Sequence, residues 1–422
     1  MTGSDLVPVE QVLAELLDAV DPLGTVRVPV RDALGAVAAV DITAAVPQPR
    51  FDNAAMDGFA IRAADTSGAS VAHPVRLELV GESFAGAGHE GSPVGPTEAV
   101  TIATGAPLPA GADTIVRVEH STRRGPVVLV HAEVRRGTDV RRTGEDLRAG
   151  DVVVPAGSVF GPGQLAAAAG CGHAELTVQR RPRVAVALTG DEVVRADTPG
   201  GPLAPHAVHD AVGPALAALL CDAGSAPVTL HGPLQDDAGR LRETLSDLAD
   251  QVDLLITVGG VSKGVRDHLP TVLGRLGPLS AGNVALRPGK PFRHGRIGAT
   301  VVLCLPGNPG AALVAAQVFA RPVVALQAGH DATAASPTLA TLSEPFSQPT
   351  GCWHWVRARV TEEAQGPHVR PAGAQGSAML HSLAAANAWM VVPPDVSVLD
   401  VGAEVQVVPT WGDRGRATWR PK

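Results

Sequence analysis

The spacing of apolar residues predicts different kinds of structure in different parts of the chain. Apolar residues recur at helical spacing between residues 9 and 20, so the chain is expected to open with an amphipathic helix. Residues 47–130 are rich in Pro and Gly and contain short β-like runs such as VRLELV and AVTIAT, which indicates a small β-rich domain. A hairpin-like run, DVVVPAGSVF, and a short helix follow between residues 150 and 179.

From Arg183 onward, apolar β-branched runs alternate with helical segments. The expected strands are residues 184–188, 227–231, 253–258 and 300–305, and the expected helices are residues 212–222, 236–249, 267–276 and 309–326. This alternation implies βαβ units and a mainly parallel sheet that is covered on both faces. After Gly329 the alternation stops, and runs such as HWVRARV and AEVQVVP predict a terminal β-barrel or sandwich.

Length, charge and cysteine placement narrow the class of protein. A chain of 422 residues is too long for one compact core, so two to four domains are expected. The net charge of −8 argues against nucleic acid as a partner, because its phosphates demand a basic surface, so any anion has to be bound locally. The four cysteines are far apart and form no CxxC pair, and the first nine residues lack a signal-peptide layout. These features predict a cytoplasmic protein without a zinc or disulfide framework.

The most apolar stretch, residues 311–328, bears on the membrane question. It is interrupted by Gln317, Arg321 and Pro322, so it is a poor candidate for a membrane span. No association with a membrane is therefore expected.

Each strand expected in the parallel sheet ends in polar or glycine-rich sequence. These endings are TGDE, GPLQDD, GGVSKG with a following Asp, and PGNP, at residues 189–192, 232–237, 259–267 and 306–309. Ligands of open parallel sheets bind in the crevice beyond the carboxyl ends of the strands. The four segments therefore predict one binding site, although any single one is also explained as an ordinary strand-to-helix turn.

The residue types in these segments favour capture of an anion. Gly259, Gly260, Gly264 and Gly307 allow backbone N–H groups to approach an oxyanion closely. Asn308 is a good N-cap and Pro309 a good first helical residue, so the last helix would direct its positive end at the crevice.

Carboxylates in the same segments suggest a divalent cation. Asp236 and Asp267 are expected to bind Mg²⁺, with water and phosphate completing the coordination shell. His206 and His209 are read as loop histidines rather than a metal pair. No Walker A motif, GxGxxG after a strand or HExxH is present, and Ser262 is not flanked like a nucleophile elbow.

Lysine is rare in this chain. Only Lys263, Lys290 and Lys422 occur among 34 basic residues, and the two internal lysines fall in the glycine-rich segments GGVSKG and RPGKP. Lysine is a compact charge suited to an oxyanion, whereas arginine is a planar fork. A coding bias toward arginine is the competing explanation.

A second group of polar segments lies in the Pro/Gly-rich region. These are FDNAAMDGFAIR, TGAPLPAGADTIVRVE and RRTGEDLRAGD, at residues 51–62, 104–119 and 141–151. Composition alone predicts surface turns for all three.

Taken in order, these segments resemble the MoeA-type molybdopterin molybdenumtransferase family, which includes the C-terminal part of gephyrin. The matching motifs are FDNAAMDGFA, TGAPLPAGAD, RxGED, TGDE, GGVSKG with Asp, RPGKP, LPGNP and QGSAMLHSLAAAN. The resemblance implies a multidomain α/β plus β protein. It places a discontinuous linker domain at 1–45 and 145–180, an inserted β-rich domain at 46–144, a molybdopterin-binding α/β domain at 181–329 and a C-terminal β-barrel domain at 330–422.

The resemblance also implies an activity and partners. The family transfers molybdenum from molybdate to adenylylated molybdopterin, assisted by magnesium, and releases AMP. It implies an elongated homodimer in which each site forms between the α/β domain of one subunit and the β-rich domain of the other, and contact with the adenylyltransferase of the pathway.

The functions of family residues are assigned only to positions of this chain that match the family's motifs. The resemblance implies catalytic roles for Asp57, Asp146, Glu192 and Lys290. It implies substrate contacts for Thr104, Arg142, Gly259, Gly260, Ser262, Arg287, Pro306, Gly307 and Asn308. The resemblance places the acids of the metal site at Asp236, which Asp237 follows, and at Asp267.

The chain departs from the family pattern in several pocket positions. Ala54 and Phe59 replace a serine and a tyrosine around AMDG, and Ala211 and Val212 replace the last two residues of DSN. Val265 stands where an acid is common, and Arg287 where a lysine is common. Two other functions therefore stand beside the transferase: a catalytically weakened paralogue that binds or assembles molybdopterin, and a related adenylyltransferase. The long β-rich domain and terminal barrel favour the transferase over the adenylyltransferase.

Overall fold

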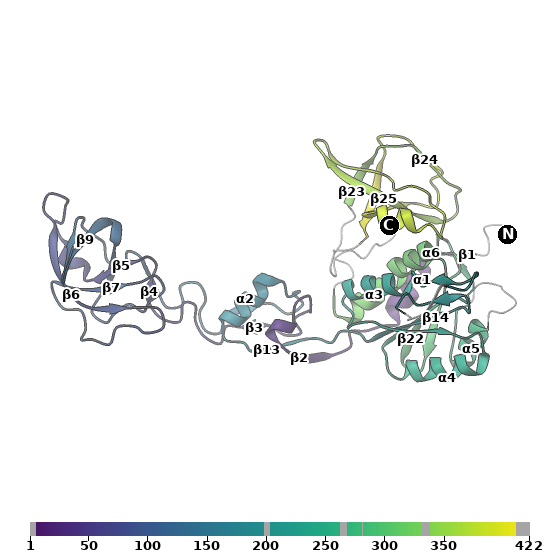
Figure 1. The fold of residues 1–422 in the computed structure, drawn as a ribbon, viewed down its shortest axis with the longest axis horizontal. Helices are drawn as coiled ribbons and strands as arrows, with labels where there is room; N and C mark the ends of the chain where they lie inside the picture. Colours follow the sequence, from purple (N-terminus) through teal and green to yellow (C-terminus); the bar gives the residue numbers. More distant parts are fainter. Residues whose placement is uncertain (1–5, 198–202, 262–267, 281, 331–337, 411–422) are drawn as a thin grey trace.

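A computed structural model describes residues 6–197, 203–261, 268–280, 282–330 and 338–410. The molecule is elongated (Figure 1), with a β-rich inserted domain at one end, a narrow linker in the middle, and an α/β domain beside a C-terminal barrel at the other end. The multidomain α/β plus β architecture expected from the sequence is thus confirmed.

The α/β domain is built on a five-stranded sheet in the order β17-β14-β18-β22-β21. The pairs β14/β17, β14/β18 and β18/β22 are parallel, and only the edge pair β21/β22 is antiparallel. Its strands are β14 (Val184–Thr189), β17 (Thr229–Leu234), β18 (Leu254–Val258), β21 (Arg293–Ile297) and β22 (Thr300–Leu305). The strands predicted in this domain are therefore present, with their ends shifted by a few residues.

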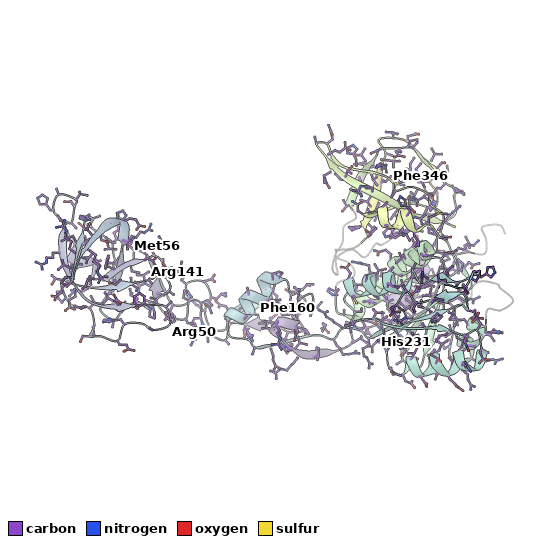
Figure 2. All side chains as sticks on the ribbon, viewed as in Figure 1. Arg50, Met56, Arg141, Phe160, His231 and Phe346 are labelled. Atoms are coloured by element: carbon purple, nitrogen blue, oxygen red, sulfur yellow. The ribbon has the colours of Figure 1, made fainter. Side chains whose placement is uncertain are left out.

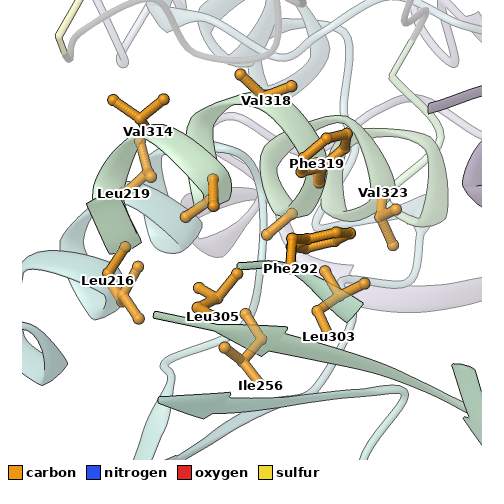
Figure 3. Packing of buried hydrophobic residues seen from close by; sticks show 14 of the residues in the cluster. Leu216, Leu219, Ile256, Phe292, Leu303, Leu305, Val314, Val318, Phe319 and Val323 are labelled. Carbon is orange, nitrogen blue, oxygen red and sulfur yellow. The ribbon is translucent and has the colours of Figure 1, made fainter. Parts of the chain in front are cut away.

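Helices cover both faces of this sheet, as the near-continuous apolar strands predict. On one face, residues of the central strands such as Ile256 of β18 pack with Leu216 and Phe319 (Figure 3). On the other face, Ala185 and its neighbours pack against Leu245 and other apolar residues of two helices. The helices are α3 (Gly213–Asp222), α4 (Ala238–Ala249), α5 (Leu269–Leu276), α6 (Pro309–Ala315) and α7 (Arg321–Gln327), with a π-helical turn at Ala316–Ala320 joining the last two.

The helical run Pro309–Gln327 is long and apolar enough to cross a membrane by length and composition. In the structure 83% of its most apolar 18-residue stretch is buried, and the run packs against the sheet through residues such as Val314 and Phe319 (Figure 3). Its apolarity is therefore accounted for by its place in the domain core.

The first helix, α1 (Val9–Asp18), confirms the amphipathic pattern. The domain bounds expected from the resemblance include it in the linker segment 1–45, and in the structure Val9, Val12, Leu13 and Leu16 lie in the core cluster of the α/β domain. The physical reason is that the apolar face of α1 finds a large apolar partner in α7 and the π-helical turn, which the narrow linker does not offer. The short strands β1 (Leu6–Val7) and β19 (Asn283–Val284) pair beside it.

The linker contains a two-stranded antiparallel ribbon. It pairs β2 (Thr25–Pro29) with β13 (Glu175–Gln179), and β3 (Ile42–Thr43) pairs with β12 (Val152–Val154) beside α2 (Pro162–Gly170). Two distant parts of the sequence thus run side by side, which makes the linker discontinuous. Its small core is centred on Phe160.

The inserted domain is a six-stranded sheet in the order β8-β5-β7-β6-β10-β9. Its strands are β5 (Gly58–Ile61), β6 (Val75–Ser83), β7 (Glu98–Ile102), β8 (Thr114–Arg117), β9 (Ser121–Arg124) and β10 (Val127–Val130). The chain enters and leaves this domain through a paired strand couple, β4 (Asn53–Ala54) and β11 (Val140–Arg141).

The C-terminal domain closes into a barrel. The sheet order β25-β26-β23-β29-β27 returns to β25 through the β25/β27 pair, so five strands form a ring. They are β23 (Thr338–Leu342), β25 (Trp353–Glu363), β26 (Gly366–Pro371), β27 (Ala388–Val392) and β29 (Glu404–Pro409), with β24 (Phe346–Ser347) and β28 (Val398–Leu399) as a separate pair and α8 (Leu380–Ala385) beside the ring. Strand β20 (Leu286–Arg287) joins β25 and so ties the α/β domain to the barrel.

Candidate functional site

The carboxyl ends of the parallel strands border a cleft of about 590 Å³. Its lining comes from four strand-to-helix segments of the α/β domain and from one segment of the barrel. The lining residues are Leu188, Thr189, Gly190, Glu192, Val193, Val208, His209, Asp210, Ala211, Val212, Asp236, Val258, Gly259, Gly260, Gly307, Asn308, Pro309, Ala378 and Leu380. The structure thus brings together all four strand endings that the sequence placed at one site.

Close packing of backbone explains the glycines of the GGVS segment. Gly259 has φ of +91°, and a Cβ there would lie 2.8 Å from the Thr189 hydroxyl oxygen. That hydroxyl donates a hydrogen bond to the carbonyl of Val258 (3.0 Å). Only glycine fits this conformation and this approach. Ser262 and Asp267, both predicted site residues, lie outside the described residues.

The PGNP segment leads from β22 into α6. Asn308 occupies the N-cap position and its side chain makes no capping hydrogen bond, while Pro309 is the first helical residue. Gly310 donates its backbone N–H to the carbonyl of Ser377 in the barrel (2.8 Å). This contact draws the QGSAM segment over the cleft, where Ala378 and Leu380 join the lining. Pro306 precedes these residues and is buried.

The neighbouring acids Asp236 and Asp237 have different surroundings. Asp236 lines the cleft and also a second cavity of about 640 Å³, formed with Gly190, Asp191 and Gln235 among others. Asp237 is the N-cap of α4 and accepts the backbone N–H of Arg240 (2.8 Å). Asp236 therefore lies in the wall of both cavities, whereas Asp237 stabilises a helix.

Two further acids border the cleft. Glu192 lines it, and its carboxylate lies against Gly190, where a Cβ would be 2.9 Å from Oε2. Asp210 accepts the backbone N–H groups of Val212 (2.8 Å) and Gly213 (2.9 Å), and so caps the start of α3.

The RPGKP turn lies beside the cleft rather than in it. Arg287 and Lys290 are both exposed, and neither is among the described residues that line the cavity. The Lys290 carbonyl accepts the backbone N–H of Val284 (3.0 Å). Gly289, between them, packs toward the first turn of α6, since a Cβ there would lie 3.5 Å from the Ala311 carbonyl oxygen. Lys290 in this turn is therefore adjacent to the rim of the cleft.

A second polar cluster lies in the inserted domain, where Asp57 meets Thr104. The Asp57 carboxylate accepts both the backbone N–H (2.7 Å) and the hydroxyl (2.8 Å) of Thr104. These two hydrogen bonds lower the pKa of Asp57, so its exposed carboxylate stays ionised and oriented. Asp57 directly follows Met56, which lies with Arg141 on the side of the domain toward the linker (Figure 2).

Arg142 belongs to the polar residues at the same end of the domain. It donates to Asp52 (2.6 Å), which also accepts the backbone N–H and the hydroxyl of Thr143. The backbone N–H of Thr143 is the main reason why the pKa of Asp52 is lowered, and Arg142 adds to it. Asp146 lies further along this turn, where its backbone N–H bonds the Gln48 carbonyl (3.1 Å). Its charge adds to burial in raising the pKa of Cys171 in the linker.

Some polar residues of this end are not indicated by the sequence motifs. Arg117 and Asp139 form a two-pronged ion pair (2.7 Å each). Arg117 lies opposite Gly58 in the β5/β8 pair, which places the ion pair beside Asp57. The partner of Arg142 and the role of Thr143 were likewise missed. The available signal was the unusual density of acids and arginines in residues 51–62 and 113–146.

The two clusters do not meet within one chain. The inserted domain and the α/β domain lie at opposite ends of the molecule, separated by the linker (Figure 1). Asp57 and Thr104 are thus brought together, as are Glu192, Asp236, Gly259, Gly260, Gly307 and Asn308, but each group lies in its own domain.

Family models match nearly the whole chain. "MoeA N-terminal region (domain I and II)" matches residues 7–172, "Probable molybdopterin binding domain" residues 185–326, and "MoeA C-terminal region (domain IV)" residues 340–410. The fold and the cleft therefore define a multidomain protein whose α/β unit is of the molybdopterin-binding class.

Whole proteins match as well. Molybdopterin molybdenumtransferase 2 of Mycobacterium tuberculosis is 35% identical over 404 residues, covering 94% of this chain and 97% of that protein. Molybdopterin molybdenumtransferase of Bacillus subtilis is 31% identical over 407 residues, covering 95% and 94%. A crystal structure of a molybdopterin biosynthesis MoeA protein from Pyrococcus horikoshii is 29% identical, with a TM-score of 0.76 over 96% of this chain and 100% of that one. The chain belongs to the MoeA family of molybdopterin molybdenumtransferases, which are transferases of molybdenum cofactor biosynthesis.

Proposed function

We propose that this protein transfers molybdenum from molybdate to adenylylated molybdopterin and releases AMP. The observation that carries the proposal is the cleft at the carboxyl ends of β14, β17, β18 and β22. It combines backbone N–H groups of glycine-rich segments, the first turn of α6 and the acids Glu192 and Asp236. Such a combination binds a phosphate-bearing substrate beside a site for a cation.

Magnesium fits the donor chemistry of this cleft. Within the described residues, no three His, Cys, Asp or Glu side chains lie close enough to form a metal site by themselves. Mg²⁺ is usually bound by one or two carboxylates together with water and substrate phosphate, whereas a closed zinc site needs more protein ligands. Asp236, with Asp267, would hold the ion, and the bound ion would neutralise phosphate charge.

The proposal includes a homodimer with composite sites. Asp57 and Thr104 present an ionised carboxylate at one end of the molecule, and the cleft lies at the other end (Figure 1). The two-stranded linker separates them in one chain, and the proposal is that the inserted domain of a partner supplies Asp57 to the cleft. All four cysteines are free, which supports a cytoplasmic location.

A non-catalytic molybdopterin-binding protein is the second reading of the missing pocket hydroxyls. The oriented carboxylate of Asp57, held by Thr104, supports the enzyme instead, because binding of molybdopterin in the cleft does not by itself require a second polar cluster in the inserted domain.

The test uses purified full-length protein with adenylylated molybdopterin, molybdate and magnesium. We expect AMP release that depends on molybdate, together with cofactor able to activate a molybdenum-free apoenzyme. Binding of adenylylated molybdopterin without AMP release would support the non-catalytic reading and contradict the proposal.

A further inference from the structure

The charges around the cleft are unevenly distributed. Its described lining contains the acids Glu192, Asp210 and Asp236, and no Lys or Arg. His209 is the one histidine in that lining. A phosphate-bearing substrate is anionic, so a side chain able to donate a hydrogen bond to an oxyanion has particular value among these acids.

The backbone around His209 is fixed on both sides. His209 ends the short strand β16 (Val208–His209), which pairs in parallel with β15 (Val193–Val194). Val208 donates its N–H to the Glu192 carbonyl (2.8 Å), and Asp210 donates its N–H to the Val194 carbonyl (2.9 Å). The capping bonds of Asp210 then anchor the segment to α3.

Arg195 holds the other end of this segment. Its guanidinium donates to the Leu230 carbonyl on β17 (3.2 Å) and forms a two-pronged pair with Asp197 (2.9 and 2.6 Å). The β15/β16 pair that carries His209 is therefore fastened at one end to β17 of the central sheet and at the other end to α3.

The side chain of His209, in contrast, is not engaged. It is exposed, and within the described residues its ring makes no hydrogen bond. A donor that is held in place by its backbone and faces a cavity with no internal partner is suited to a ligand.

We propose that His209 donates a hydrogen bond to a tetrahedral oxyanion bound in the cleft, the phosphate of the adenylylated substrate or molybdate itself. The inference rests on the proposed function for the identity of the anion. It adds a substrate-binding residue to the cleft, and it assigns a ligand contact to a histidine that the sequence alone indicated as an ordinary loop residue.

The test compares His209→Phe, which removes the donor, His209→Asn, which keeps an N–H donor, and the control His206→Phe. His206 is exposed on the same loop and is not part of the cleft lining. AMP and molybdate are titrated separately into each full-length protein by calorimetry, and thermal unfolding verifies that each variant is folded.

We expect His209→Phe to weaken binding of one oxyanion by about ten- to a hundredfold, His209→Asn to weaken it less, and His206→Phe to leave it unchanged. Weaker binding of AMP alone assigns the contact to phosphate, and weaker binding of molybdate alone assigns it to the metal oxyanion. Unchanged affinity of His209→Phe for both, or no binding of either by the wild-type protein, would overturn the inference. A failed proposed function is seen separately, as absence of AMP release by the wild-type protein.

Discussion

Asp236 and Asp237 are adjacent in sequence but differ in what surrounds their carboxylates. Asp237→Ala removes the N-cap of α4 and should lower the free energy of unfolding by about 1 kcal/mol, with little effect on turnover. Asp236→Asn should raise the magnesium concentration needed for half-maximal turnover. Denaturant unfolding and magnesium-dependent AMP release measure the two effects. If Asp236→Asn lowered the stability and Asp237→Ala changed the magnesium dependence, Asp236 would not act at the metal.

Thr104 orients the carboxylate of Asp57 through two hydrogen bonds. Thr104→Val removes the hydroxyl bond, keeps the backbone bond and nearly keeps the side-chain volume, so kcat/KM should fall about tenfold. Thr122→Val is the matched control, because Thr122 is an exposed threonine of the same domain whose hydroxyl bonds His131 (2.8 Å). Steady-state kinetics of both variants test this, and equal activities would exclude an orienting role for Thr104.

At the scale of residues, the sequence indicates which residues belong to a site better than it indicates which of them contact each other. The TGAP and AMDG motifs indicate Thr104 and Asp57, and the structure adds that they bond each other. The ion pairs of Arg142 with Asp52 and of Arg117 with Asp139 join residues that are 90 and 22 positions apart in the sequence. No local pattern determines such pairs, because they depend on the register in which strands and turns meet.

At the scale of secondary-structure elements, the linker is joined to the α/β domain through one acid, Asp253. Asp253, just before β18, accepts two hydrogen bonds from Arg180 (2.9 and 3.0 Å) and the backbone N–H of Arg183 (2.8 Å). Burial alone would raise the pKa of Asp253, but these donors outweigh it and lower the pKa to about 2. The linker ribbon is thus fastened to the base of the sheet.

This lowered pKa makes part of the stability depend on acid pH. An unfolded Asp has a pKa of about 3.9, so the contribution of Asp253 is fully present above pH 4 and is lost as the pH falls from about 4 to 2. Asp253→Asn should lose roughly 1–2 kcal/mol at pH 7, after allowance for solvent screening, and lose less than the wild type between pH 4 and 2. Thermal unfolding across this range is the measurement, with the exposed Asp247→Asn as control. A loss of the same size in both variants would contradict the role of Asp253.

Element types were predictable because strands buried on both faces read as continuous apolar runs, as in VAVALT and TVVLCL. The place of α1 was not predictable. Its apolar face fits any apolar surface, and only the folded arrangement shows that α7 and the π-helical turn present that surface.

At the scale of the whole molecule, the separation of Asp57 from the cleft predicts complementation between defective subunits. Asp57→Asn and Asp236→Asn proteins are mixed under conditions that exchange subunits, at a limiting magnesium concentration at which each variant alone is nearly inactive. If the site is composite, mixed dimers contain one intact site, and random assortment should restore about one quarter of wild-type turnover. AMP release by the mixture measures this. If both residues act within one chain, mixing restores nothing.

The order of the domains was predictable because the motifs occur along the chain in the family's order. The barrel was predictable from short alternating strands. The separation of the two polar clusters was not, because the distance depends on the linker ribbon formed by residues 25–29 and 175–179, and no motif in either segment indicates their pairing.

The paired entrance to the inserted domain has an evolutionary consequence. Asn53 pairs with Arg141 and Ala54 with Val140, and Gln48 lies opposite Leu147 at the junction with the linker. The two crossing points are therefore neighbours, and the polypeptide between them forms a loop that leaves and rejoins the linker at one place. A single recombination event that replaces the gene segment between codons 49 and 146 would exchange the domain as a cassette without disturbing the chain on either side. Chimaeras between relatives joined at these two positions should fold, and would separate what the inserted domain contributes to substrate choice from what the cleft contributes.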